Sequence, residues 1–217
     1  MSTWHVERRM AKNPSNRKAL TSSTRRGARY TSKSKAFPWT AVLLTALAAL
    51  GVGWAGWSWW QGRQVGGDFA RLAEQGKPQL GRVIERPDAG RLHAALGQPL
   101  GFRDDPPTSG THWPSWTSAG FYTAAEPKEK LVHSMEHGNV VIYYDQPGDE
   151  ALRTLRAWAG RFRGQWDGLV VVRKAGIGRG IELTAWNRLL RLEGWDAAAA
   201  AAFVDAYRGR GPENPVR

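Results

Sequence analysis

The chain has 217 residues, a formal net charge of +12 and no cysteine. That length allows one domain with a substantial apolar core. The absence of cysteine excludes disulfides, thiolate nucleophiles and thiolate metal ligands, so any metal site must consist of histidine, carboxylate or methionine side chains.

The N-terminal arm, residues 1–36, carries most of the positive charge. It holds ten Lys and Arg against one acid, Glu7, whereas the rest of the chain holds 21 against 18. Because it has few apolar residues, we expect the arm to be disordered and to touch anionic lipid. Nucleic-acid binding is the alternative, but we expect none because no aromatic platform accompanies the charge.

An apolar segment follows and predicts a transmembrane helix over residues 37–60. No charged residue lies between Trp39 and Trp60, and a helix of this length crosses a hydrocarbon core of about 30 Å. Tryptophans gather at both ends, as is typical of the membrane interface. Because basic residues concentrate before this segment, the positive-inside rule places the arm in the cytoplasm and the rest of the chain outside the cell membrane.

A cleaved signal peptide is the alternative to this single-pass anchor, since "ALA" at 46–48 is similar to a cleavage site. However, the apolar run continues for twelve residues beyond it, and the region before it is unusually long. A buried core helix is disfavoured because the segment has no polar face. The sequence therefore favours an uncleaved anchor.

Beyond the anchor we expect a juxtamembrane stalk over 61–80 and one globular extracytoplasmic domain over 81–217. A short helix is predicted over 64–77 and one or two short strands over 79–103. A loop is predicted over 104–120, where three prolines and two glycines disfavour regular structure.

The second half of the chain alternates between strand and helix patterns. Strands are predicted over 139–145, 168–174 and 181–186, and helices over 147–162 and 196–209. The "GIGRG" at 176–180 predicts a hairpin turn between two strands and lacks the spacing of a nucleotide-binding motif. Together these elements predict an α+β fold, with one N-terminal transmembrane helix followed by a small mixed α/β domain.

The stretch "HSMEHG" carries two histidines, His133 and His137, four positions apart. They would share one side of a helix or one side of a strand, and the strand would add Met135 to that side. Pro127 before the stretch and Gly138 after it support the helical alternative. Either conformation presents two imidazoles together, as a divalent metal requires.

Two further histidines, His112 and His93, lie earlier in the predicted domain. Prolines at 106, 107 and 114 stiffen the loop that carries His112. Such a loop can deliver a third imidazole to the pair and complete a three-histidine site. The alternative is four unrelated histidines, each hydrogen-bonded in a core or on a surface.

Four strings carry a family resemblance: "PPTSGTHWP", "LVHSMEHGNVVIYYD", "LTAW" and "FVDAYRGRGPE". Over residues 85–214 the chain resembles the bacterial family called domain of unknown function 3105. The resemblance implies one N-terminal membrane helix and a set formed by His93, His112, His133 and His137 with Glu136. It disfavours Met135 as a ligand, because the family more often has leucine at that position.

The expected metal is copper or zinc, with copper slightly preferred, because imidazole ligands suit both and Cu(II) has the higher affinity. A closed four-histidine site implies binding, whereas three ligands and an open position allow a metal-bound water to react. Glu136 is expected to accept the free N–H of a ligand imidazole and so to fix its tautomer.

Two other functions remain open. Residues 133–137 match the H-x-x-E-H pattern of zinc peptidases, with Glu136 as general base and Glu182 or Glu193 as third ligand. Against this, an apolar strand follows the motif at once and the domain is small. A cell-envelope scaffold without metal is the other alternative, since "WTSAGFY" at 116–122 and the many tryptophans can form an aromatic binding surface.

Overall fold

The structure is a computed structural model that describes residues 38–217, except for the side chains of residues 58–67. Its first helix, α1, runs without a break from Trp39 to Gly76. The segment Trp39–Trp57 of α1 is long and apolar enough to cross a membrane. Residues 64–76 are helical and the helix ends at Gly76, as predicted, but they continue α1 and do not form a separate short helix. The arm, residues 1–36, lies outside the described residues.

The rest of the chain forms a mixed α/β domain, which confirms the predicted fold class. Its elements in chain order are η1 (Lys77–Arg82), β1 (Ile84–Glu85), β2 (Gly120–Phe121), α2 (Lys128–His137), β3 (Val140–Tyr144), α3 (Asp149–Arg161), β4 (Leu169–Arg173), β5 (Ile181–Ala185), β6 (Arg188–Leu192) and α4 (Ala197–Tyr207). The strands and helices predicted over 139–145, 147–162, 168–174, 181–186 and 196–209 are confirmed, but β6 was not predicted.

The six strands form one mixed sheet in the order β1-β6-β5-β3-β4-β2. Strand β3 pairs in parallel with β4 and antiparallel with β5, so it lies between them. The hairpin predicted for 176–180 was therefore wrong, because a hairpin joins two neighbouring antiparallel strands. The segment instead carries the chain from β4 across the end of β3 to β5.

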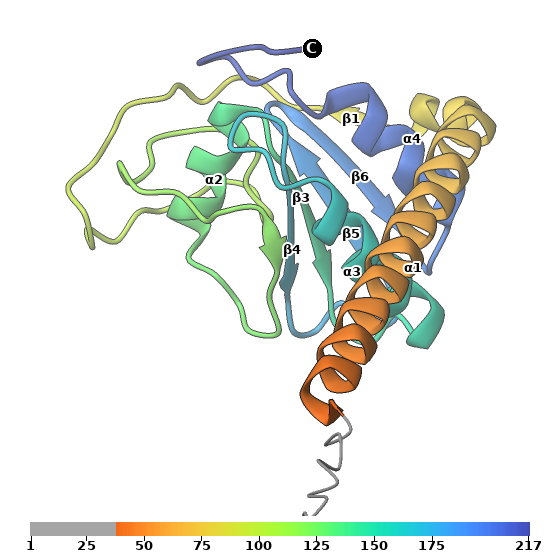
Figure 1. Ribbon diagram of the computed structural model, residues 1–217. Coiled ribbons are helices and arrows are strands. Elements are labelled where there is room, and N and C mark those ends of the chain that lie inside the picture. Colours follow the sequence, from red (N-terminus) through yellow and green to blue (C-terminus); the bar gives the residue numbers. More distant parts are fainter. Residues whose placement is uncertain (1–37) are drawn as a thin grey trace, which may run out of the picture. The chain divides into compact units, whose positions relative to one another are not determined.

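Helices cover both faces of this sheet. The side chains of β3 alternate, so that Val140, Ile142 and Tyr144 face one side while Val141 and Tyr143 face the other. The first side packs against α3, α4 and the end of α1, and the second packs against α2 (Figure 1). Helix α2 thus packs its apolar face against this side of the sheet, and its opposite face can contact other segments.

The segment 86–119, between β1 and β2, forms no helix or extended strand and is pinned at several points. The Gly110 amide donates to the Gly90 carbonyl at 2.8 Å, and the Asn187 amide donates to the Thr108 carbonyl at 3.1 Å. The Ser134 hydroxyl of α2 donates to the Thr117 carbonyl at 2.8 Å. These bonds fix the proline-rich loop against α2 and the β5–β6 turn.

Candidate metal centre

Helix α2 separates the polar from the apolar residues of "HSMEHG". Residues three and four apart share a helix face, so His133, Glu136 and His137 lie together. Met135 lies on the opposite face and is fully buried in the apolar cluster that α2 forms with the sheet. Gly138 ends the helix in a left-handed conformation, with φ of 109°. The helical alternative is therefore the one observed, and it turns Met135 away from the histidines.

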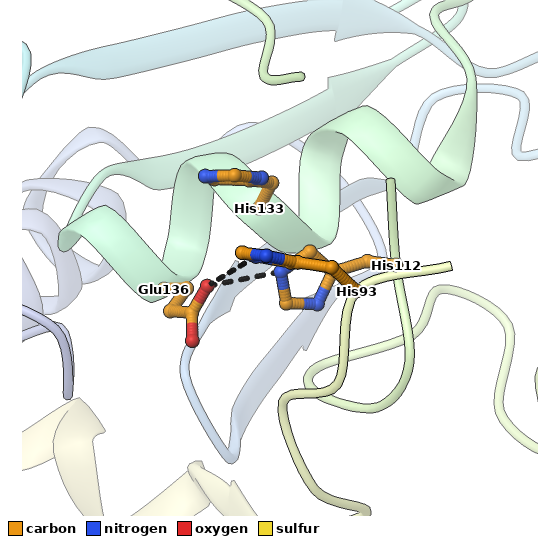
Figure 2. A group of neighbouring side chains, drawn as sticks. All are labelled: His93, His112, His133 and Glu136. Atoms are coloured by element: carbon orange, nitrogen blue, oxygen red, sulfur yellow. Dashed lines mark hydrogen bonds and ion pairs between the residues drawn. The ribbon is translucent and has the colours of Figure 1, made fainter. Parts of the chain in front are cut away.

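A short backbone pairing places His93 beside His112. The Ala94 amide donates to the His112 carbonyl at 2.8 Å, and the His112 amide donates to the Leu92 carbonyl at 3.0 Å. The two imidazole rings consequently lie 4.9 Å apart between centroids. Figure 2 shows both rings reaching from the loops toward the face of α2 that carries His133 and Glu136.

These side chains form the first ligand group: His93, His112, His133 and Glu136. Each offers one ligand atom, and the four atoms all lie within 4.8 Å of one another. Glu136 Oε2 lies 2.9 Å from His112 Nε2 and 3.5 Å from His93 Nε2 (Figure 2). Donor atoms around a tetrahedral ion with bonds near 2.1 Å are roughly 3.4 Å apart. The two contacts of Glu136 are therefore near the spacing of ligands on one ion, and the whole group could hold a divalent transition metal if its ligand atoms, all within 4.8 Å, drew closer.

Two of these imidazoles have their tautomers set by the proline-rich loop. His112 Nδ1 lies 2.7 Å from the Gly110 carbonyl, and His133 Nδ1 lies 2.7 Å from the Trp113 carbonyl. A carbonyl only accepts, so each Nδ1 carries the proton and donates it. In the neutral ring Nε2 then holds the lone pair, which is the usual arrangement of metal-bound histidine.

The contact between His112 and Glu136 has a chemical consequence. Because His112 Nδ1 donates to Gly110, a neutral ring would turn its Nε2 lone pair toward the Glu136 oxygen, 2.9 Å away. His112 is fully buried, and two electron pairs facing each other there would repel strongly. A proton or a metal ion must therefore lie between these two atoms.

The second ligand group contains His133, His137 and Glu213. His133 Nε2 lies 3.1 Å from His137 Nε2, which lies 3.2 Å from Glu213 Oε2. Glu213 belongs to the C-terminal tail, residues 208–217, which folds back onto the end of α2. Sequence reasoning missed Glu213, because nothing in the local pattern indicates that this tail meets the histidines.

Burial shapes the electrostatics of the His133–His137 pair. Desolvation lowers the pKa of His137 to about 4, and the neighbouring His133 ring adds to the effect. Desolvation likewise lowers the pKa of His133. Both rings are therefore uncharged at neutral pH and keep a lone pair for a metal.

Two tryptophan rings pack against the His137 ring. The ring lies 4.5 Å from Trp166 and 4.8 Å from Trp116 between centroids. Its Nδ1 is buried without a hydrogen-bond partner among the residues that the structure describes. The two tilted ring contacts thus leave Nε2, directed at His133 and Glu213, as the nitrogen of this ring with polar neighbours among the described residues.

The structure groups the predicted residues differently from the sequence. His93, expected only as a possible fourth ligand, belongs to the first group, whereas His137 belongs to the second. The Glu182 carboxylate pairs with Lys174 and Arg191. Neither it nor Glu193 is a member of either ligand group.

Comparison with known families places this cluster within the part of the chain that matches one family. Residues 93–217 match the family described as protein of unknown function (DUF3105), and this range includes every member of both ligand groups. No curated protein and no solved structure matches the chain. The match covers more than half of the sequence, and the chain belongs to this family.

Proposed function

We propose that this DUF3105 protein is a membrane-anchored metal-binding protein that holds a divalent transition metal with the first ligand group. One observation carries the proposal: three imidazoles and a carboxylate from three separate segments converge until their ligand atoms lie within 4.8 Å. Three of these four side chains are buried. Burying so many polar groups together costs free energy unless something satisfies them, and a bound cation does so.

Copper is the preferred ion, ahead of zinc. The donor set consists of imidazole nitrogens and a carboxylate oxygen, and it suits copper, zinc, nickel and iron. For a given set of such ligands Cu(II) has the highest affinity in the divalent series. The absence of cysteine throughout the chain removes the thiolate that would favour zinc or Cu(I) in a closed structural site.

The proposed location is the outer face of the cell membrane. Segment Trp39–Trp57 supplies the anchor, and the basic arm before it stays in the cytoplasm next to anionic lipid. A stalk over 61–80 then leads to the metal-binding domain over 81–217.

A zinc-dependent hydrolase is the second candidate, and one contact favours it. Glu213 lies next to His137 and can add the third ligand, a carboxylate, that the H-x-x-E-H pattern requires besides His133 and His137. The reading is less favoured because the would-be base, Glu136, is held by the buried His112 at 2.9 Å. A water between Glu136 and the metal would have to displace that contact.

Metal retention tests the proposal. The full-length chain is purified in detergent with a tag that contains no histidine, stripped with chelator, loaded with Cu(II) or Zn(II), and desalted before elemental analysis. We expect bound metal in the wild type and at least ~10-fold weaker binding in His93→Ala/His133→Ala, as is usual when a site loses ligands or their supports.

The matched control is His5→Ala, which makes the same chemical change in the arm, outside both ligand groups. It should bind as the wild type does. A wild-type protein that retains no Cu(II) or Zn(II) after loading would overturn the proposal. A cell-envelope scaffold without metal would then be the remaining function. Metal content of protein isolated from its own membranes without chelator then decides between copper and zinc.

A further inference from the structure

The close contacts of the cluster divide it into two sets of three. Glu136 contacts His93 and His112, at 3.5 and 2.9 Å. His137 contacts His133 and Glu213, at 3.1 and 3.2 Å. Each set has two imidazoles and one carboxylate, and each carboxylate oxygen lies at the spacing expected of neighbouring ligands on one ion.

His133 decides how the two sets share their ligands. Its Nδ1 donates to the Trp113 carbonyl, so only Nε2 is free to coordinate. One lone pair binds one ion, and this one points toward His137 Nε2. With two ions present, His133 therefore serves the ion at His137, and the other ion keeps His93, His112 and Glu136.

The C-terminal tail is fitted closely to the end of α2, which brings Glu213 into place. The Gly209 amide donates to the Gly138 carbonyl at 2.8 Å, and the Glu213 amide donates to the Glu136 carbonyl at 3.2 Å. A Cβ at Gly211 would lie 2.2 Å from the Glu136 carbonyl oxygen. The backbone thus approaches α2 as closely as glycine permits and holds the Glu213 carboxylate over His137.

Charge is also balanced between the two sets. Each set supplies one carboxylate to offset part of the charge of a divalent ion. Two divalent ions about 4 Å apart are held in this way in known two-metal sites.

We infer that the domain binds a second divalent metal ion at His133, His137 and Glu213, next to the first ion, so that the centre is dinuclear. The inference rests on the proposed function and extends it: Glu213 and the tail complete a second position. Each ion has three protein ligands and keeps a position open to solvent or to an exogenous ligand.

Stoichiometry tests the inference with Cu(II) as the probe. Full-length protein in detergent, stripped and reloaded, should retain two Cu(II) ions per chain. Glu213→Gln should retain one, because a neutral amide replaces the charged ligand at a side chain that is 45% exposed. Glu136→Gln should also retain one. The matched control Glu193→Gln, an exposed glutamate outside both groups, should retain two.

Electron paramagnetic resonance gives a second readout. Two neighbouring Cu(II) ions should give a broadened, spin-coupled spectrum in the wild type, and each single glutamate variant should give the signal of an isolated Cu(II). One ion per chain in the wild type, with an uncoupled spectrum, would overturn the dinuclear inference and leave the proposed function standing. No retained ion in the wild type would overturn both.

Discussion

At the scale of single residues, His93 and His112 contact the same oxygen, Glu136 Oε2, but one is exposed and the other is buried. His112 is fully buried and has a polar partner at each ring nitrogen, whereas the side chain of His93 is 48% exposed. Both contact Glu136 Oε2. Their effects on metal binding should therefore be alike, while their effects on folding should not.

Replacing His112 by alanine should destabilise the metal-free protein by about 2–4 kcal/mol, because it opens a cavity, removes the imidazole partner of the Gly110 carbonyl and removes the closer of the two imidazole contacts of Glu136. His93→Ala should cost less than about 0.5 kcal/mol, as exposed substitutions usually do. Urea denaturation of the detergent-solubilised chain in excess chelator measures both. Equal losses for the two variants would show that the burial of His112 has no bearing on stability.

His112, His133 and His137 were predicted from a local signal, whereas the family resemblance added His93 and Glu136, the latter as an acceptor for a ligand imidazole and not as a ligand. A spacing of four residues puts His133 and His137 on one side of a helix, and prolines next to His112 indicate a rigid loop. Glu213 could not be found in this way, since its place depends on the tail folding back over Gly138. The division into two groups depends likewise on ring orientations that only the folded loop sets.

At the scale of elements, the centre is built where three pieces meet: α2, the proline-rich loop and the C-terminal tail. The loop contributes His112 and also the Trp113 carbonyl that orients His133. The tail contributes Glu213 and is held close to α2 through Gly211. A change in the tail that alters no ligand should therefore still change the metal content.

Gly211→Ala is expected to act in this way. The added Cβ would lie 2.2 Å from the Glu136 carbonyl oxygen and 2.2 Å from the Gly138 amide nitrogen, so the tail must move away from α2. We expect one bound Cu(II) instead of two, as for Glu213→Gln, with the circular dichroism spectrum unchanged.

Gly160→Ala is the matched control, because its Cβ meets no atom within 4 Å and the residue is exposed on α3. It should keep two ions and slightly raise stability, since alanine is the better helix former. Two ions in Gly211→Ala would show that the tail does not need its close contact with α2 to supply Glu213.

Element types were predictable along most of the domain, but their pairing was not. Strands β3, β4 and β5 follow from runs of β-branched residues, and α4 follows from its alanines and the Asp196 cap, whose side chain accepts the Ala199 amide at 2.9 Å. The wrong hairpin at 176–180 arose because β4 pairs with the earlier β3 and not with its successor. Strand neighbours of this kind are set by packing over the whole sheet.

At the scale of the whole molecule, the metal centre, the anchor and the charge distribution point to one arrangement across a membrane. The 1–36 arm holds ten basic residues and precedes the apolar span, so the positive-inside rule predicts that it lies in the cytoplasm. The histidine cluster would then face the outside, where it meets exogenous metal without crossing the bilayer.

The lack of cysteine makes this topology directly testable, because one introduced thiol reports one position. Ser15→Cys marks the arm, and Ala175→Cys marks an exposed turn of the domain away from both ligand groups. In intact cells a membrane-impermeant maleimide should label Ala175→Cys and spare Ser15→Cys, which should react only after lysis. The reverse pattern would show the opposite orientation, with the histidine cluster in the cytoplasm. A shortened chain that Ala175→Cys labels before lysis, and that carries no Ser15→Cys label even after lysis, would favour the cleaved signal peptide, because cleavage at 46–48 removes position 15.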